Sequence, residues 1–167
     1  MAHKHLYLLR HAHALERQGN ESDFERNLSP TGLQNSTRMG INLLKKEVSF
    51  DMIVSSPAER AKNTAELVAE QIKYNTDSIY MNNTIYEASP RNLLQVVNNL
   101  KPEWKSVLMV GHNPAISYLA EYLTGSEIGN MTTCGLAYIK FENMKWEDIL
   151  EYSGKLISYE YPDLLNF

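Results

Sequence analysis

The sequence has a single cysteine, Cys134, among its 167 residues, so no internal disulfide can form. It also lacks long apolar runs. The run nearest the N-terminus, His5–Leu9, is about five residues long, which is too short for the core of a signal peptide or for a transmembrane helix. A lone cysteine fits a reducing compartment. We therefore expect a cytoplasmic protein that has no membrane partner.

An excess of positive charge is absent as well. Lysine and arginine number 16 against 20 aspartates and glutamates, and the formal net charge is -4. Proteins that bind nucleic acid usually present basic surfaces, so this balance argues against nucleic acid as a partner. A few arginines gathered at one place can still form a local phosphate site. The apolar content of 43% and the length fit one globular domain, which we place over residues 1–167.

Internal repeats and low-complexity segments are missing, and the chain instead alternates short apolar runs with amphipathic segments. Three apolar runs predict buried strands, at residues 6–9, 52–54 and 107–110. The apolar faces of the predicted helices have residues that recur every three to four positions. These residues are Leu33, Thr37, Ile41 and Leu44 after a Ser29-Pro30 cap; Ala61, Ala65, Val68 and Ile72 after a Ser56-Pro57 cap; Leu93, Val97 and Leu100; and Ile116, Leu119, Ala120 and Leu123.

The remaining segments complete the expected fold. Residues 16–28 and 75–83 are predicted to be loops, and residues 136–141 and 146–152 to be antiparallel strands. The aromatic tail from Ser158 onward is expected to dock on the domain. Buried strands that alternate with amphipathic helices indicate an α/β fold, a three-layer α/β/α sandwich with a mainly parallel sheet.

Charged and imidazole side chains follow three of these strands. Arg10 and His11 come directly after the first strand, and His112 follows the third. Arg60 lies one turn into the helix that follows the second strand. In an open α/β sheet, ligands bind at the carboxyl ends of the strands. Two guanidinium groups directed at one place require a dianion to neutralise them, and phosphate is the common biological choice.

The same residues can perform phosphoryl transfer. An imidazole attacks phosphorus directly when it is neutral and one ring nitrogen is free, and it then carries the phosphoryl group covalently. Arg10 and Arg60 should disfavour the cation of His11 and hold the phosphoryl oxygens. His112, if protonated, would be a third cationic donor. An alkoxide leaving group needs a general acid, and Glu87, just before a helix, is the carboxylate best placed by sequence.

A series of sequence blocks, in order along the chain, carries a resemblance to a known family. The blocks are Leu9-Arg10-His11, Arg26-Asn-Leu-Ser-Pro-Thr-Gly32, Ser55-Ser-Pro-Ala-Glu-Arg60-Ala-Lys-Asn-Thr64-Ala65, Tyr86-Glu87-Ala88, Gly111-His112-Asn113-Pro114 and Thr132-Thr-Cys134-Gly135. The chain resembles the histidine phosphatase superfamily, which has the phosphoglycerate-mutase-like fold. Within it, the chain is most similar to the short SixA-type phosphohistidine phosphatases. The similarity runs from His5 to about Phe141.

This resemblance implies a phosphatase with His11 as its nucleophile, and it implies that neither a metal nor another cofactor is needed. The implied phosphate pocket consists of Arg10, His11, Arg60 and His112. Family members differ in whether a proton donor lies at the position of Glu87. The larger superfamily usually has glycine where this chain has Ala12, whereas the short branch often carries alanine. Alanine at this position predicts a negative φ.

The substrate is predicted from residues 75–105, which hold only a loop and one short helix. Larger members of the superfamily insert a lid-like subdomain there, and such lids enclose small metabolites. A pocket without a lid should be open to a phosphorylated side chain on another protein. Imidazole also leaves phosphorus readily once it is protonated, so cleavage of phosphohistidine would depend little on Glu87. We therefore expect the partner to be a phosphohistidine domain of a signalling or phosphotransfer protein.

Three other functions fit parts of the pattern. The first is a phosphomonoesterase that acts on a small phosphorylated molecule or a phosphoserine-like group. The second is a phospho-ligand binding module without turnover, although the presence of His11 argues against it. The third is a metal hydrolase built on the pair His11 and His13, for which the sequence supplies no completing set of ligands.

Several residues also have a purely structural interpretation. For Arg60 it is a surface ion pair with Glu59 or Glu66, and for Glu87 it is a solvated loop carboxylate. Structural roles are the main expectation for three others: a salt bridge to Asp23 for Arg26, solvent exposure for His13, and packing for Cys134.

Overall fold

The computed structural model of the chain describes residues 3–165. Residues 1–2 and 166–167, the ends of the predicted domain and of its aromatic tail, lie outside the described residues. The strands are β1 Lys4–Arg10, β2 Met52–Ser55, β3 Tyr80–Met81, β4 Ser106–Gly111, β5 Leu136–Phe141 and β6 Lys155–Glu160. The α-helices are α1 Pro30–Lys45, α2 Glu59–Gln71, α3 Pro90–Asn98 and α4 Ala115–Thr124. Short 3-10 helices are η1 Asp23–Glu25, η2 Thr76–Ser78, η3 Asn83–Ile85, η4 Trp146–Asp148 and η5 Pro162–Leu164.

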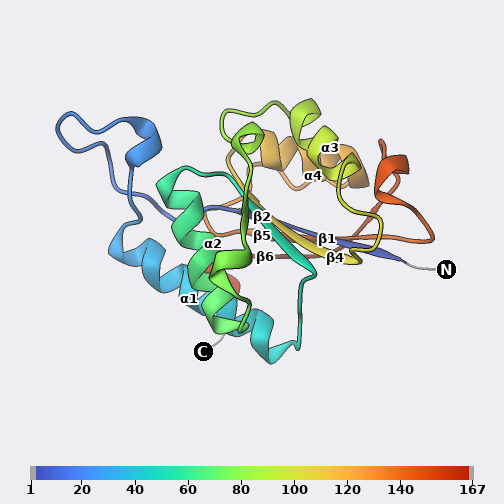
Figure 1. Cartoon of the computed structure of the whole chain (residues 1–167), viewed down its shortest axis with the longest axis horizontal. Helices are drawn as coiled ribbons and strands as arrows, with labels where there is room; N and C mark the ends of the chain where they lie inside the picture. Colours follow the sequence, from blue (N-terminus) through green and yellow to red (C-terminus); the bar gives the residue numbers. More distant parts are fainter. Residues whose placement is uncertain (1–2, 166–167) are drawn as a thin grey trace.

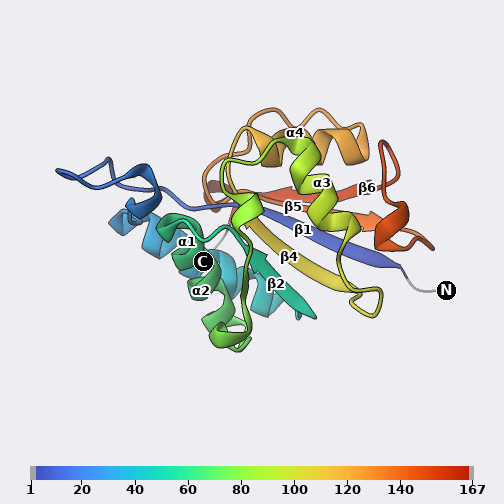
Figure 2. The same cartoon turned by 45° about the horizontal axis from the view of Figure 1, so that its top comes forward.

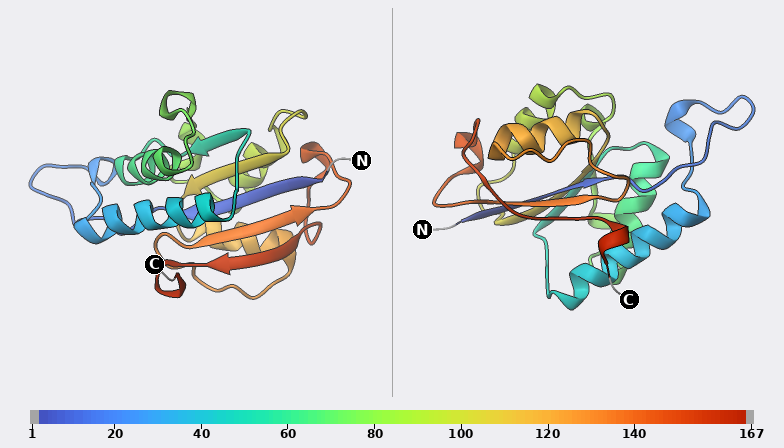
Figure 3. Two further views of the ribbon diagram at one scale, coloured as in Figure 1. Left: turned by 90° about the horizontal axis from the view of Figure 1, so that it is seen from below. Right: turned by 180° about the vertical axis from the view of Figure 1, so that it is seen from behind.

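The six strands form one sheet in the order β3-β2-β4-β1-β5-β6 (Figure 1). The first four strands of this order run parallel to one another, and β5 runs antiparallel to both of its neighbours. Figure 3 shows β1, in dark blue, between β4 in yellow and β5 in orange. The predicted α/β class with a mainly parallel sheet is therefore confirmed.

Helices cover both faces of the sheet, which gives the predicted three layers. Helices α1 and α2 pack on one face, and α3 and α4 pack on the other (Figure 2). Along β1, Leu6 and Leu8 point into the core beneath α3 and α4, whereas Tyr7 and Leu9 point into the core beneath α1 and α2. A strand buried on both faces is apolar without alternation, which explains the continuous run in the sequence.

The predicted apolar faces of α2, α3 and α4 are confirmed with one exception. The buried members are Ala61, Ala65, Val68, Leu93, Val97, Leu100, Ile116, Leu119, Ala120 and Leu123. Ile72 follows the end of α2 and is half-buried. These faces were predictable because each helix presents a single apolar stripe to one side of the sheet.

The apolar face predicted for α1 is wrong. Leu33 and Leu44 are 47% and 44% exposed, and the other two predicted residues are half-buried. The buried side of the helix instead carries Gly32, Ser36, Met39, Gly40 and Leu43. A Cβ on Gly40 would lie 2.7 Å from Cβ of Gln71 at the end of α2, so the two helices meet through a position without a side chain. Close helix contact selects the face with small residues, which the spacing of the leucines does not reveal.

The predicted strand at 146–152 is also wrong. The 3-10 helix η4 occupies the start of this segment, and β6 begins later, at Lys155. Asn98 of α3 donates hydrogen bonds from Nδ2 to the carbonyl oxygens of Trp146 and Ile149, at 2.8 and 3.0 Å. Both of these residues are buried. The segment is a turn that is hydrogen-bonded to α3, and its buried apolar side chains give it the composition of a strand.

The predicted loops and tail contain short elements. Residues 16–28 include η1, and residues 75–83 include η2 and β3, which pairs in parallel with β2. In the tail, Pro162 is buried and Leu165 packs against the core beneath α1 and α2, so the predicted docking is confirmed for its described part. No helix within residues 3–165 combines the length and the apolar character needed to cross a bilayer.

Gly32, in the first turn of α1, should tolerate no side chain. A Cβ at this position would lie 2.1 Å from the carbonyl oxygen of His13, which is a backbone atom and cannot swing away. We expect Gly32→Ala to lower the free energy of unfolding by about 1–3 kcal/mol, although alanine normally favours a helix over glycine. Urea unfolding of the variant measures the change.

Thr31→Ala, at the exposed neighbouring position of the same turn, is the matched control. Its free energy of unfolding should stay within about 0.5 kcal/mol of the parent value. An unchanged or higher stability of Gly32→Ala would show that the contact with His13 relaxes without cost, contrary to this prediction.

Candidate active site

The register of the parallel strands brings the ends of β1, β2 and β4 together. Arg10, the last residue of β1, pairs with Gly111 of β4, and β2 pairs with β4 up to its own last residue, Ser55. The ladder continues one residue further, because the backbone N–H of His11 donates to Gly111 O at 3.0 Å. The ring centroids of His11 and His112 are consequently 5.0 Å apart. Residues that are distant in the sequence therefore meet at the carboxyl edge of the sheet.

A pocket of about 340 Å³ lies at this edge and gathers the four predicted phosphate ligands. Its lining consists of Arg10, His11, His13, Ala14, Glu16, Arg26, Arg60, His112, Asn113 and Thr133. A larger cavity of about 540 Å³ lies beside α3 and β2 and contains none of these residues. The chemistry that the sequence predicts is thus concentrated in the smaller and more polar pocket.

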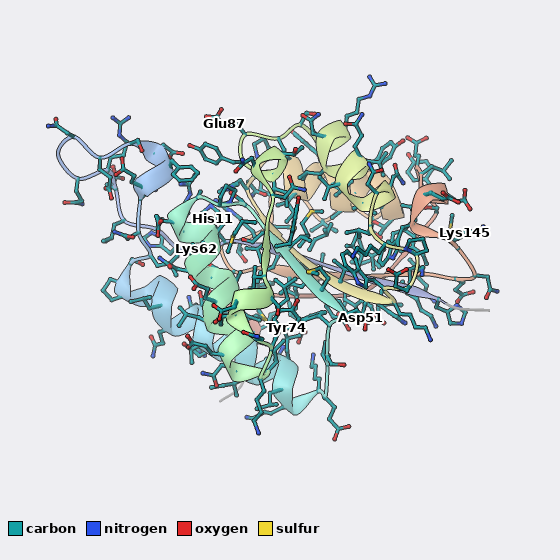
Figure 4. All side chains as sticks on the ribbon, viewed as in Figure 1. His11, Asp51, Lys62, Tyr74, Glu87 and Lys145 are labelled. Carbon is teal, nitrogen blue, oxygen red and sulfur yellow. The ribbon has the colours of Figure 1, made fainter. Side chains whose placement is uncertain are left out.

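The structure does not bring Glu87 into the lining of this pocket. Glu87 is exposed, and Figure 4 shows its side chain at the outer surface, away from His11. The carboxylate that does line the pocket belongs to Glu16. His13 is exposed, as predicted, and its Nδ1 lies 2.7 Å from Ser29 Oγ. Among residues 3–165, no group of three or more His, Cys, Asp or Glu side chains is arranged to hold a metal ion.

His11 is held as a neutral ring with one free nitrogen. Its Nδ1 lies 2.8 Å from the carbonyl oxygen of Ala12, which can only accept, so Nδ1 carries the proton. Burial lowers the pKa of His11 to about 3, and the charges of Arg60 and Arg10 contribute in the same direction. The predicted effect of the arginines therefore has the right sign, but burial is the larger cause. Near pH 7, Nε2 has an unshared electron pair and is available for nucleophilic attack.

His112 is oriented by Ser56. Its Nε2 lies 2.7 Å from Ser56 Oγ, which also accepts from the backbone N–H of Ala58 at 3.2 Å. When the Ser56 O–H donates to Nε2, the neutral ring of His112 carries its proton on Nδ1. Burial and the charge of Arg60 lower the pKa of His112 to about 4, so the ring is not a third cation near pH 7. Ser56 is hydrogen-bonded to His112. The prediction that Ser56 caps α2 is wrong, because Ala58 holds the N-cap position.

Three buried nitrogen atoms on residues that line the pocket have no hydrogen-bond partner. They are Arg10 Nε, Arg60 Nε and His112 Nδ1, and no other buried side-chain nitrogen or oxygen within residues 3–165 shares this property. Leaving a buried polar group without a partner costs about 1–3 kcal/mol. All three atoms belong to residues that the sequence predicts to bind phosphate.

Both arginines are anchored by the remaining atoms of their guanidinium groups. Arg10 Nη1 donates to Met131 O at 2.8 Å. Arg60 Nη1 donates to Asp23 O at 2.7 Å, and Arg60 Nη2 donates to Asp23 Oδ2 at 3.0 Å. Arg60 is only 6% exposed, so it is not the surface arginine of the structural alternative. The predicted bridge between Arg26 and Asp23 is confirmed, with Nη1 and Oδ1 at 3.2 Å.

Thr64 and Cys134 hold the backbone next to His11. The N–H of Ala12 donates to Thr64 Oγ1 at 3.0 Å, and this hydroxyl donates to Arg60 O at 2.7 Å. The N–H of Cys134 donates to His11 O at 3.1 Å. The φ of Ala12 is not positive, in agreement with the prediction from the sequence. Burial raises the pKa of the Cys134 thiol to about 12, which fits the structural role expected for it.

Four residues around the pocket were not predicted for the contacts that they make: Glu16, Asp23, Ser56 and Thr64. Ser56 and Thr64 belong to the same sequence block as Arg60, and Asp23 lies three residues before Arg26. Membership of the block was the available signal for Ser56 and Thr64, and closeness to Arg26 was the signal for Asp23. Glu16 lies in a loop, where hydrophobic periodicity carries no information.

Fold and site define a class of protein, an α/β protein whose strand ends bring a neutral histidine and two arginines, Arg10 and Arg60, to one pocket. The model of the histidine phosphatase superfamily (branch 1) matches residues 6–82. The uncharacterized phosphatase PhoE of Bacillus subtilis is 30% identical over 135 residues, which cover 60% of this chain and 69% of that protein. The chain belongs to the histidine phosphatase superfamily, branch 1.

Solved structures agree with this assignment over nearly the whole chain. The SixA protein of Agrobacterium tumefaciens matches with a TM-score of 0.81 at 25% identity and covers 95% of this chain and 98% of its own. The protein histidine phosphatase SixA complexed with tungstate matches with a TM-score of 0.83 at 23% identity and covers 97% and 99%. The resemblance inferred from the sequence blocks is confirmed.

The lowered pKa of His11 predicts a loss of stability in weak acid. The folded state keeps this ring neutral down to about pH 3, whereas the unfolded chain binds a proton below the ordinary pKa of 6.5. The unfolded state therefore gains protons as the pH falls from 7 to 5, and folding loses roughly 1–2 kcal/mol from this residue. Urea unfolding of the parent and of His11→Asn at both pH values measures the contribution.

Asparagine retains a donor for Ala12 O and has no titrating ring, so His11→Asn should lose less stability than the parent between pH 7 and pH 5. Above pH 7 the ring is neutral in both states, and the two proteins should respond to pH alike. Equal losses in acid would mean that His11 titrates normally in the folded protein.

Proposed function

We propose that this phosphatase removes the phosphoryl group from phosphohistidine on a signalling or phosphotransfer protein, without a metal. His11 carries the phosphoryl group between two chemical steps, and Arg10, Arg60 and His112 hold the phosphoryl oxygens. The observation that supports this proposal most strongly is the set of three buried, unpartnered nitrogen atoms on Arg10, Arg60 and His112, which line the pocket with His11. A tetrahedral oxyanion supplies the acceptors that these nitrogen atoms lack.

In the first step, His11 Nε2 attacks phosphorus, and the bond from phosphorus to the substrate nitrogen breaks with its electron pair. The leaving imidazole takes up a proton and departs as a neutral ring. The ring of His11 gains positive charge when Nε2 binds phosphorus, and its Nδ1–H donor to Ala12 O stabilises that charge. Arg10 and Arg60 act on the phosphoryl oxygens, where negative charge is concentrated in the transition state.

In the second step, water attacks phosphorus, and the bond between phosphorus and His11 Nε2 breaks and returns its electron pair to the ring. Inorganic phosphate leaves, and the proton of the attacking water passes to a base. We assign this acid–base work to Glu16, which lines the pocket, with Glu87, the carboxylate that the sequence suggests, as the alternative. Imidazole is a good leaving group, so the first step depends little on either carboxylate.

Phosphohistidine as the substrate is supported by the segment between β3 and β4. Only the 3-10 helix η3 and the helix α3, nine residues long, lie there, and no inserted subdomain covers the pocket. A phosphorylated side chain on another protein can therefore reach His11. The likeness to the protein histidine phosphatase SixA, whose structure contains tungstate, supports both the oxyanion and the substrate class.

The covalent intermediate gives the most direct test. Radiolabelled phosphohistidine protein, mixed with the enzyme and quenched in alkali during the first turnovers, should leave label on His11. The bond should be stable in alkali and labile in acid, and peptide mapping locates it. His11→Asn should carry no label and should lose roughly 1,000-fold or more of the turnover rate, because no nucleophile replaces the ring.

His5→Asn is the control, since His5 lies at the other end of β1 from the pocket. This variant should be labelled on His11 at the parent level. Label on another residue, or turnover without a labelled intermediate, would refute the covalent role of His11. Binding of phosphate without turnover of any phosphorylated compound would favour the binding module, and loss of turnover in EDTA would favour the metal hydrolase.

Rates on two classes of substrate separate the proposal from the phosphomonoesterase alternative. The parent should cleave phosphohistidine protein faster than alkyl phosphates. Glu16→Gln should slow alkyl phosphate hydrolysis by about 10–100-fold and should leave cleavage of the P–N bond nearly unchanged, because an alkoxide needs the acid more than imidazole does. Steady-state kinetics on both substrates measures the two effects.

Glu87→Gln is the matched variant for this experiment. A slower rate for Glu87→Gln and an unchanged rate for Glu16→Gln on alkyl phosphates would move the acid–base role to Glu87. Faster turnover of alkyl phosphates by the parent would show that the enzyme is a phosphomonoesterase.

A further inference from the structure

Asp23 connects Arg60 to the loop before α1. It is the first residue of η1, in a loop that extends away from the body of the molecule (Figure 1 and Figure 2). Arg60 Nη1 donates to the backbone oxygen of Asp23 at 2.7 Å, and Arg60 Nη2 donates to its Oδ2 at 3.0 Å. Two bonds to one residue restrict both the position and the plane of the guanidinium group.

A guanidinium group has two edges that can each hold a pair of acceptors. One is the end formed by Nη1 and Nη2, and the other is the side formed by Nε and the adjacent Nη2 hydrogen. Asp23 occupies the end of Arg60. Arg60 Nε is buried without a partner, and Arg60 lines the pocket of His11. The side edge of Arg60 is therefore available to a phosphoryl group while Asp23 stays in place.

The carboxylate of Asp23 is itself held from two further directions. Tyr86 donates its O–H to Oδ2 at 2.9 Å, and Arg26 donates from Nη1 to Oδ1 at 3.2 Å. Although burial acts in the opposite direction, hydrogen bonds from Tyr86, Arg26 and Arg60 lower the pKa of Asp23 to about 2. Asp23 is thus charged near pH 7. Two arginines sharing one carboxylate retain one net positive charge, and Arg10 adds a second, which still matches a dianion.

Tyr86 also packs between η1 and the pocket. Its ring makes an edge contact with Phe24, at 5.1 Å between centroids, and another with His112, at 5.6 Å. The hydroxyl that bonds Asp23 is therefore positioned by contacts on both sides of the ring. Asp23, whose side chain is 46% exposed, is thus held by hydrogen bonds from Arg60, Arg26 and Tyr86.

We propose that Asp23 is a positioning residue that holds Arg60 with its Nε–Nη2 edge toward the phosphoryl group, and that Tyr86 fixes the carboxylate for this purpose. The inference rests on the proposed function, because it concerns the same phosphoryl site. Asp23 acts through Arg60 and does not touch the substrate. The opposite interpretation is that Asp23 competes with phosphate for Arg60, and the two interpretations predict effects of opposite sign.

Tungstate and inorganic phosphate are the probes for the first experiment, with binding measured by titration calorimetry. Asp23→Asn should raise both dissociation constants by about 10–100-fold, because a misplaced guanidinium loses bidentate contact with the oxyanion. Tighter binding would show that Asp23 competes with the anion. Unchanged binding would show that Asp23 serves only the loop. Either result would overturn the proposal.

Asp77→Asn is the matched control, since it removes the same charge from another 3-10 helix, η2, outside the pocket lining. It should bind both anions like the parent. Thermal unfolding midpoints, measured alongside, separate a loss of fold from a loss of position. If Asp23→Asn does not fold, Tyr86→Phe replaces it. That variant keeps the ring, loses the bond to Oδ2, and should raise the constants by about 2–10-fold. No change in Tyr86→Phe would likewise overturn the proposal.

A double-mutant cycle tests whether Asp23 acts through Arg60. In an Arg60→Ala background, Asp23→Asn should weaken tungstate binding no further. An additional loss of the same size as in the parent would overturn the positioning role.

Tungstate binding needs no turnover, so the two proposals can fail separately. Weaker tungstate binding by Asp23→Asn, in an enzyme that does not cleave phosphohistidine, would retain the positioning role and refute the proposed substrate. Normal cleavage of phosphohistidine by the parent, together with unchanged tungstate binding by Asp23→Asn, would support the proposed substrate and overturn the positioning role.

Discussion

The parallel pairing of β1 with β4 and of β4 with β2 is the constraint on which the site depends. This ladder fixes the register of three strands, so the residues that follow them emerge next to one another. Both faces of β1 are buried, and a slip of one residue would exchange the side chains of its two cores. The same slip would separate His11 from His112. Stability of the sheet and geometry of the pocket are therefore one requirement.

Burial determines the protonation state of His11, and it also costs stability because buried nitrogen atoms lack hydrogen-bond partners. Removal from water keeps His11 neutral, as the proposed attack on phosphorus requires, and it leaves nitrogen atoms of both arginines without partners. Met131 and Asp23 limit that cost, because they accept hydrogen bonds from the other end of Arg10 and Arg60. Under the proposed function, an entering oxyanion would meet donors that are already held in place. Preorganised donors in a buried site are the physical basis of transition-state stabilisation in phosphoryl transfer.

Elements whose partners lie on both faces or along one broad stripe were predictable from the sequence. Strand β1 and helix α4 are of this kind, because apolar composition alone places them in the interior. The buried face of α1 was not predictable, since it depends on Gly40 approaching Gln71 of a different helix. The segment at Trp146 was misassigned for a related reason. Its backbone is bonded to Asn98, and no local pattern records that contact.

The sequence by itself determined the chemical groups and their places at strand ends, which was enough to predict the α/β fold and the histidine phosphatase resemblance. Only the tertiary structure decided which nitrogen of His11 bears the proton, that His112 is neutral, and that Arg60 bonds to Asp23. It also placed Glu87 at the surface, although its local sequence suggested a site. Protonation and contact depend on burial and on neighbours from distant parts of the chain, and these exist only once the chain has folded.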